Sequence, residues 1–195
     1  MRKVKYLIAY FNVIRLFPHL LFFLIHKSEC EDDIIVNSES TMKGASLLTR
    51  FLTLMVFDKY YRHLFYHRIG SARYIISFLC PSHDCFFISP TTKIGKGLQL
   101  GHPFSSVINA SKIGEHCAIF QDVTVGNSRG GRPIIGSNVS IFVNSVVIGN
   151  ITIGDNVTIG SCTFINKDVP SNCTVVGIPA RIVNLNGEKV NIPLK

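Results

Sequence analysis

The sequence predicts a mainly β protein, in which a parallel β-helix of hexapeptide repeats follows an α-helical N-terminal region. Two patterns predict this fold. From Ile88 onward, aliphatic residues recur every six positions, often with a glycine directly after them, whereas the preceding part carries apolar residues at three- and four-residue spacing. We therefore expect helices over residues 1–80, a β-helix domain over 81–184 and a C-terminal tail over 185–195.

Composition limits the class of partner. The chain has 195 residues, of which 47% are hydrophobic, and this is enough for a sizeable core. The net charge of +8 is spread along the chain, and no nucleic-acid-binding motif is present, so we expect no nucleic-acid partner. The 6 cysteines form no CxxC pair and no zinc-like cluster with histidine, which predicts no metal site and a reducing, cytoplasmic location.

An apolar stretch near the N-terminus, "YLIAYFNVIRLFPHLLFFLI" over residues 6–25, is about long enough to cross a bilayer. Asn12, Arg15, Pro18 and His19 interrupt it, and an arginine at mid-membrane costs about 2.5–3.5 kcal/mol. Three interpretations stay open: helices packed within an oligomer of this chain, a peripheral helix on the inner membrane surface, or a membrane span.

Residues 46–79 are expected to be helical, since they lack proline and place Leu47, Phe51, Leu54 and Met55 at helical spacing. The hydroxyl groups of "SEST", residues 38–41, are expected to cap this helix. Gly70 is expected to divide it, and Pro81 to end it because proline lacks an N–H group.

The six-residue period fits neither a helix nor a simple alternating strand. It predicts short strands joined by tight turns, three to a coil, with coils stacked about 4.8 Å apart as a triangular prism. Each glycine after an aliphatic residue is expected to permit a backbone bend. The aliphatic positions expected to point inward are Ile88, Ile94, Leu100, Val107, Ile113, Ile119, Val125, Ile135, Ile141, Val147, Ile153, Ile159 and Ile165. The period slips by one residue before Val107.

Three segments carry a family resemblance: "IGKGLQLGHPFSSVI" (94–108), "VTVGNSRGGRPIIG" (123–136) and "KDVPSNCTVVGIPARIV" (167–183). Together they resemble serine acetyltransferases of the hexapeptide-repeat acyltransferase family, and "YYRHLFYHRIG" is similar to members found among polysaccharide-biosynthesis enzymes. The resemblance implies a left-handed β-helix, a trimer or dimer of trimers, and acetyl transfer from acetyl-CoA. The acceptor is the hydroxyl of L-serine, as in cysteine biosynthesis, or a sugar hydroxyl.

The same resemblance implies that His102 is the general base and faces a cleft between subunits. Gly101 and Phe87 stand where the family carries carboxylates, so Asp122 is a candidate for orienting the imidazole. Arg132 is expected to bind the carboxylate of serine, because a guanidinium fork suits a carboxylate.

For the donor, the resemblance implies a pantetheine groove at Asn127, Val143 and Ser161, with Lys167 and Arg181 meeting the CoA phosphates. Direct attack on the thioester is expected, since no serine or cysteine matches an acyl-enzyme motif. The missing carboxylate leaves one interpretation of another class open, that of a catalytically weak scaffold.

Overall fold

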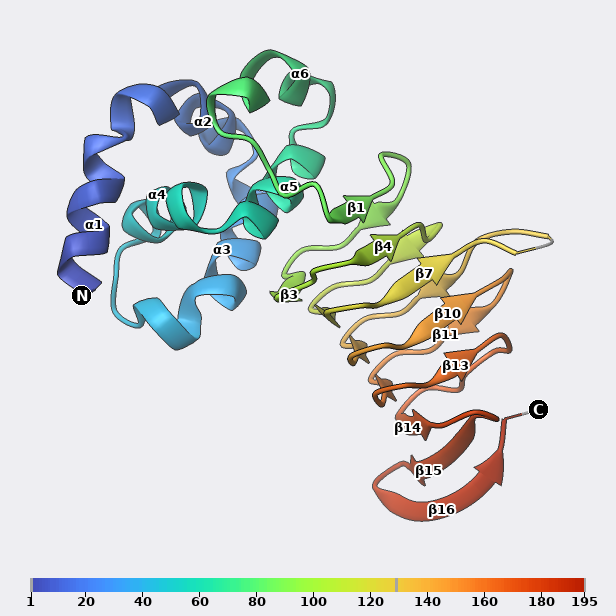
Figure 1. Ribbon diagram of the computed structural model, residues 1–195. Coiled ribbons are helices and arrows are strands. Elements are labelled where there is room, and N and C mark those ends of the chain that lie inside the picture. Colours follow the sequence, from blue (N-terminus) through green and yellow to red (C-terminus); the bar gives the residue numbers. More distant parts are fainter. Residues whose placement is uncertain (1, 129, 195) are drawn as a thin grey trace. The chain divides into compact units, whose positions relative to one another are not determined.

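The computed structural model describes residues 2–128 and 130–194, and it divides into two compact units, residues 1–84 and 85–195 (Figure 1). The first unit is helical and the second is a β-helix. The division falls four residues beyond the boundary expected from the sequence, after the short segment that follows Pro81.

The helical unit contains more breaks than the sequence predicts. Asp58 interrupts the helix expected over residues 46–79, because its Oδ1 accepts hydrogen bonds of 2.9 Å from the amides of Tyr60 and Tyr61 and so caps a new helix. Gly70, with φ +60°, ends that helix as predicted. The elements are α1 (Arg2–Phe11), α2 (Val13–Ile25), α3 (Lys27–Met42), α4 (Leu47–Phe57), α5 (Lys59–Arg68), α6 (Arg73–Ile76) and the 3₁₀ turns Gly70–Ala72 and Ser77–Leu79.

The capping prediction for residues 38–41 is wrong. These residues lie in the last turns of α3, where the Ser38 hydroxyl donates to the carbonyl of Ile34. The cap of α4 is Ser46, whose Oγ accepts a 3.3 Å hydrogen bond from the Thr49 amide. The position of the turn between α3 and α4 decides which serine caps.

Helix α4 is central to this unit, and α1, α3 and α5 pack against it. Phe51 of α4 stacks on Phe23 of α2 with centroids 4.5 Å apart, and meets the edge of Phe65 of α5 at 5.3 Å. Beside this aromatic core, Arg68 holds Asp33 through two hydrogen bonds of 2.8 and 3.1 Å. The pair is almost fully buried, so each charge depends on the other for its compensation.

Helices α1 and α2 meet at Asn12 with an angle of 85°. Among the residues that the structure describes, no single helix is long and apolar enough to cross a membrane, whereas this bent pair reaches the required length and hydropathy when the two helices are taken together.

His19 of α2 is fully buried, and its burial makes the stability of the helical unit depend on pH. Its Nε2 lies 2.9 Å from the hydroxyl of Tyr66, which itself donates to the carbonyl of Cys80, so Nε2 carries the proton of a neutral imidazole. Burial, assisted by the charges of Arg15 and Arg62, lowers the pKa of His19 from 6.5 to about 4.

Because the folded-state pKa lies below the unfolded one, the unfolded chain binds more protons between these values, and stability is lost as the pH falls. We expect the free energy of unfolding of the helical unit to drop by about 2 kcal/mol between pH 7 and pH 5 from this group. Urea unfolding at both pH values, followed by the helical circular dichroism signal, measures it. His19→Gln should flatten this dependence in part, since burial also lowers the pKa of His63 to about 4. An unchanged pH dependence in the variant would contradict the prediction.

The second unit is a left-handed parallel β-helix with three faces (Figure 1). Sheet A has the order β1-β4-β7-β10-β13, sheet B β11-β8-β5-β2, and sheet C β16-β15-β14-β12-β9-β6-β3. The strands are β1 (Phe86–Ile88), β2 (Lys93–Ile94), β3 (Gln99–Gly101), β4 (Ser106–Ile108), β5 (Lys112–Ile113), β6 (Ala118–Phe120), β7 (Thr124–Gly126), β8 (Ile134–Ile135), β9 (Ser140–Ile141), β10 (Val146–Ile148), β11 (Thr152–Ile153), β12 (Thr158–Ile159), β13 (Phe164–Ile165), β14 (Cys173–Val176), β15 (Arg181–Leu185) and β16 (Glu188–Pro193).

The last two strands close the coil by reversing direction. Strand β15 pairs antiparallel with β14, and β16 pairs antiparallel with β15. The segment 185–195, expected as a tail outside the domain, therefore supplies a strand to sheet C, with the Leu194 amide bonded to the carbonyl of Ala180 at 3.0 Å.

The inward positions expected from the hexads are buried, with Ile94 and Leu100 partly so, except at Val107. Val107 is 42% exposed, and its neighbours Ser106 and Ile108 point inward instead. The expected slip of one residue before Val107 is wrong. The turn between β3 and β4 is two residues longer than a regular hexad, which carries Ile108 into the core position and turns Val107 outward.

The glycines after the aliphatic residues have a different role from the expected one. At Gly95, Gly114 and Gly136 the backbone keeps an ordinary φ, and the reason for glycine is close stacking. A Cβ built on Gly114 would lie 2.5 Å from the backbone of Gly136 in the next coil. The left-handed turn residues come two positions later, at His116 (φ 54°) and Asn138 (φ 56°).

Candidate active site

His102 lies in a widened turn between β3 of sheet C and β4 of sheet A. Its φ is 53°, and Ser105 in the same turn has φ 58°, so this turn holds two left-handed residues. The corresponding turns of the next coils hold one each, at Asp122, Asn144 and Cys162. The two extra residues thus lift His102 out of the regular wall, and its side chain is exposed.

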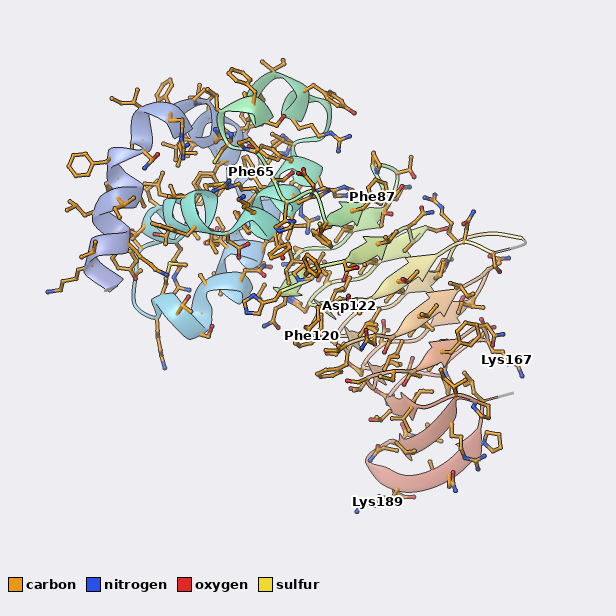
Figure 2. The ribbon with its side chains drawn as sticks, in the orientation of Figure 1. Phe65, Phe87, Phe120, Asp122, Lys167 and Lys189 are labelled. Carbon is orange, nitrogen blue, oxygen red and sulfur yellow. The ribbon has the colours of Figure 1, made fainter. Side chains whose placement is uncertain are left out.

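Asp122 occupies the same corner of the prism as His102, one coil further on. Figure 2 labels Asp122. Its amide donates a 2.9 Å hydrogen bond to the carbonyl of Phe104, just as the Cys162 amide donates to the carbonyl of Val143. This bonding puts Asp122 in register with Ser105 rather than with His102. Its carboxylate is exposed, and its role in orienting the imidazole stays a prediction.

An aromatic pair next to His102 explains the glycine before it. Gly101 pairs in register with Phe120, and a Cβ on Gly101 would lie 2.4 Å from Cδ1 of that ring. Phe120 in turn stacks on Phe142, with centroids 4.7 Å apart and planes at 10° (Figure 2 labels Phe120). An aspartate at position 101 would therefore require the Phe120 ring to move.

We call Phe120 and Phe142 the aromatic pair. This pair was not predicted from the sequence. The strand register would have revealed it, because Ile119 and Ile141 are neighbours across β6 and β9, and the residues after them then stack outside the prism.

Arg132 and Asn127 lie at another corner, in the loop between β7 of sheet A and β8 of sheet B. Nη1 of Arg132 donates to the Thr91 hydroxyl at 2.7 Å and to Oδ1 of Asn109 at 3.2 Å, which fixes the direction of the half-buried guanidinium. Asn127 is exposed. One chain therefore presents His102 and Arg132 at different corners of the prism.

The positions expected along the CoA groove divide into two sets. Val143 and Ser161 follow β9 and β12 at the same corner as His102, with Val143 half-buried and Ser161 exposed. Lys167 and Arg181 instead contact the C-terminal segment. Nζ of Lys167 lies 3.5 Å from the carbonyl oxygen of Leu194, and Arg181 donates to the Asn191 side chain and, at 3.1 Å, to its carbonyl.

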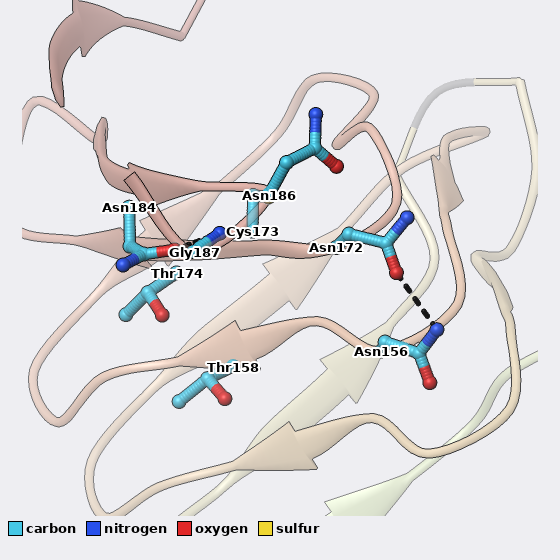
Figure 3. Close-up of a pocket in the computed structure, with 8 residues that line it drawn as sticks. All are labelled: Asn156, Thr158, Asn172, Cys173, Thr174, Asn184, Asn186 and Gly187. Atoms are coloured by element: carbon cyan, nitrogen blue, oxygen red, sulfur yellow. Dashed lines mark hydrogen bonds between the residues drawn. The ribbon is translucent and has the colours of Figure 1, made fainter. Parts of the chain in front are cut away.

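A shallow groove lies away from all of these positions, at the corner between sheets B and C in the last coils (Figure 3). Along this corner Asn138 donates to Asn156 at 3.1 Å, and Asn156 donates to Asn172 at 2.8 Å. All three asparagines have a positive φ, so this ladder stabilises the left-handed turns. The groove is lined by Asn156, Thr158, Asn172, Cys173, Thr174, Asn184, Asn186 and Gly187, none of them a predicted site residue.

Within residues 2–128 and 130–194, no group of three or more His, Cys, Asp or Glu side chains is placed to hold a metal ion.

Comparison with known proteins identifies the family. The bacterial transferase hexapeptide family (six repeats) matches residues 132–167. The chain is 36% identical over 169 residues to a serine acetyltransferase of Staphylococcus epidermidis, covering 82% of this chain and 79% of that one. It is 39% identical over 109 residues to a serine acetyltransferase of Synechococcus elongatus, covering 53% of this chain but only 45% of that relative.

A solved structure indicates the same family as these relatives. The serine acetyltransferase of Neisseria gonorrhoeae, crystallised in complex with serine, superposes with a TM-score of 0.64 at 27% identity, over 81% of this chain and 69% of that one. Both the sequence match to the Staphylococcus relative and the structural match extend beyond the hexapeptide repeats into the helical unit. The chain belongs to the serine acetyltransferase family of hexapeptide-repeat acyltransferases.

Proposed function

We propose that this protein transfers an acetyl group from acetyl-CoA to the hydroxyl of L-serine, with His102 as the general base. The observation that carries the proposal is the widened left-handed turn, which exposes the imidazole at the position where the family carries its histidine. The names of the relatives, and the serine in the Neisseria structure, support serine as the acceptor.

In the proposed reaction, His102 takes the proton of the serine hydroxyl while the oxygen attacks the thioester carbonyl carbon. Backbone N–H groups stabilise the oxyanion of the tetrahedral intermediate. The C–S bond then breaks, the acetyl group stays on the serine oxygen, and the imidazolium returns its proton to the CoA sulfur. The imidazole ends the cycle neutral, and no acyl-enzyme forms.

We also propose that the site is shared between subunits of a trimer. Because His102 and Arg132 stand at different corners of one prism, a site that uses both takes Arg132 from a neighbouring chain. Sheet A lies between these corners, and its outer face exposes Phe87 and Val107, two apolar side chains that a neighbour would cover (Figure 2 labels Phe87).

The second candidate acceptor is a sugar hydroxyl, and the aromatic pair favours it. The two stacked phenylalanine rings, both half-buried, offer apolar contact to the C–H face of a sugar ring, which serine does not need. The pair lies beside Gly101, directly before the proposed base, so it is placed to contact an acceptor of that size.

An assay of CoA release with acetyl-CoA and either L-serine or a panel of sugars separates these acceptors. We expect release with serine, and we expect Arg132→Lys to raise the KM for serine by about 10-fold or more, because lysine lacks the bidentate fork. The KM for acetyl-CoA serves as the internal control and should stay within about twofold. Release with sugars alone would replace serine by the second candidate. If neither serine nor any sugar supports CoA release, and CoA does not shift the melting temperature, both candidate acceptors are contradicted.

A further inference from the structure

Helix α1 carries an exposed apolar stripe at helical spacing. Val4, Leu7, Ile8 and Phe11 follow the i, i+3, i+4, i+7 pattern of one helix face, and all four are exposed. Phe11 is 77% exposed. The opposite face of α1 packs on α4 and buries Ala9. The stripe therefore stays exposed although α1 packs within the helical unit.

Helix α2 repeats this arrangement. Leu16, His19 and Phe23 are buried on one face, while the other face exposes a second apolar stripe. Ile14 at its start is 90% exposed. Figure 2 shows side chains that project from α1 on the side away from α4. The stripe of α2 consists of Ile14, Phe17, Leu21, Leu24 and Ile25. We call the two stripes together the apolar face.

The charged residues of α1 and α2 all have one sign. Lys3 and Lys5 lie at the start of α1 and Arg15 at the start of α2, all three exposed, and the first acidic residue of the chain is Glu29. A two-fold interface between copies of this chain would bring these cations toward one another, because such an interface uses the same patch twice. Anionic lipid headgroups instead complement them.

The lengths of the helices favour lying on a membrane over crossing it. Helix α1 has 10 residues and α2 has 13. At a rise of 1.5 Å per residue these are about 15 and 20 Å long, against a hydrocarbon core of about 30 Å. The 85° angle between them keeps them from joining into one straight rod.

From these observations we infer that the apolar face docks the protein on an anionic membrane surface, with α1 and α2 in the interface and Lys3 and Arg15 at headgroup level. Apolar side chains would enter the boundary between headgroups and acyl chains, as those of interfacial amphipathic helices do. This inference is independent of the acceptor and of the transfer reaction.

Vesicle flotation of the purified full chain tests the apolar contribution. The probes are vesicles of phosphatidylcholine alone and of phosphatidylcholine with about one third phosphatidylserine. We expect the wild type to bind the anionic vesicles, and Phe11→Ser/Ile14→Ser to lower the bound-to-free ratio at least about 10-fold. The matched control Ile35→Ser/Leu48→Ser removes apolar side chains that are 40% and 44% exposed on α3 and α4, and should bind like the wild type.

A second pair of variants tests the charge. Lys3→Gln/Arg15→Gln should lower binding to the anionic vesicles roughly 25-fold, since each cation near such a surface contributes about fivefold. Lys112→Gln/Lys189→Gln, which removes two exposed lysines from the β-helix unit, should not. Unchanged circular dichroism and melting temperature confirm that the variants are folded.

Three results would overturn the inference: no binding of the wild type to either vesicle, equal binding to both, or equal binding by Phe11→Ser/Ile14→Ser and its control. If the wild type fails to bind and Phe11→Ser/Ile14→Ser instead reduces the number of subunits in light scattering, the apolar face is an interface between copies of the chain.

Discussion

Replacing His102 by alanine is expected to reduce serine-dependent CoA release by about 10²–10⁴-fold, the usual contribution of a general base. The loss should appear in kcat, with the KM for acetyl-CoA within about twofold, because the imidazole acts on the acceptor proton and not on donor binding. His102 is exposed, so its removal leaves no cavity in the core. Steady-state kinetics with L-serine measure the effect.

His116 provides a matched control for this substitution. It is also exposed, and its φ of 54° is close to the 53° of His102, so alanine meets the same left-handed backbone at both positions. His116 lies at the corner between sheets B and C, whereas His102 lies between sheets C and A. His116→Ala should keep nearly full activity. If both variants lose activity equally, or if His102→Ala retains it, His102 is not the base.

Gly114→Ala is expected to destabilise the β-helix unit by about 3 kcal/mol, at the upper end of the usual cost of overpacking. The added Cβ would lie 2.5 Å from the carbonyl carbon and oxygen of Gly136 and from the amide nitrogen of Ser137. These are backbone atoms of the next coil, which cannot rotate away, so adjacent coils must separate. Thermal unfolding measures the loss as a lower melting temperature.

Gly126→Ala makes the same chemical change where the space is open. There the nearest atoms to the added Cβ are side-chain methyl carbons of Ile148 and Thr124, both at 3.9 Å, and the backbone of Gly126 is not left-handed. Its melting temperature should stay within about 2 °C of the wild type, because surface changes usually alter stability by less than 0.5 kcal/mol. Equal losses in Gly114→Ala and Gly126→Ala would contradict the close-stacking explanation.

The repeat pattern was sufficient to predict the regular coils, but it did not predict the longer turn between β3 and β4. From Ile135 to Ile165 the six-residue step holds, and each aliphatic residue of that run is buried as expected. Between Leu100 and Ile108 the turn is longer, and the choice between Val107 and Ile108 as the inward residue depends on which one pairs with Val125 in β7. Both are aliphatic, so composition does not distinguish them.

The candidate site shows the same division. His102 was predicted from its motif, and the structure adds the widened turn that exposes it. The stacking of Phe120 over Gly101 depends on residues 19 positions apart along the chain, which only the register of β3 and β6 brings together. The placement of Arg132 at another corner also follows from the three-sided coil and not from local sequence.

The sequence by itself determined that this protein has a helical unit followed by a hexapeptide β-helix, and it predicted His102 as the candidate base. These features are periodic or local, and hydrophobic burial at a fixed spacing needs no knowledge of distant residues. Only the tertiary structure decided which residues stack between coils, why the glycines are needed, and which face of α1 and α2 remains uncovered. Those outcomes depend on contacts between chain segments far apart in sequence, whose register is set by packing of the whole coil or helical core.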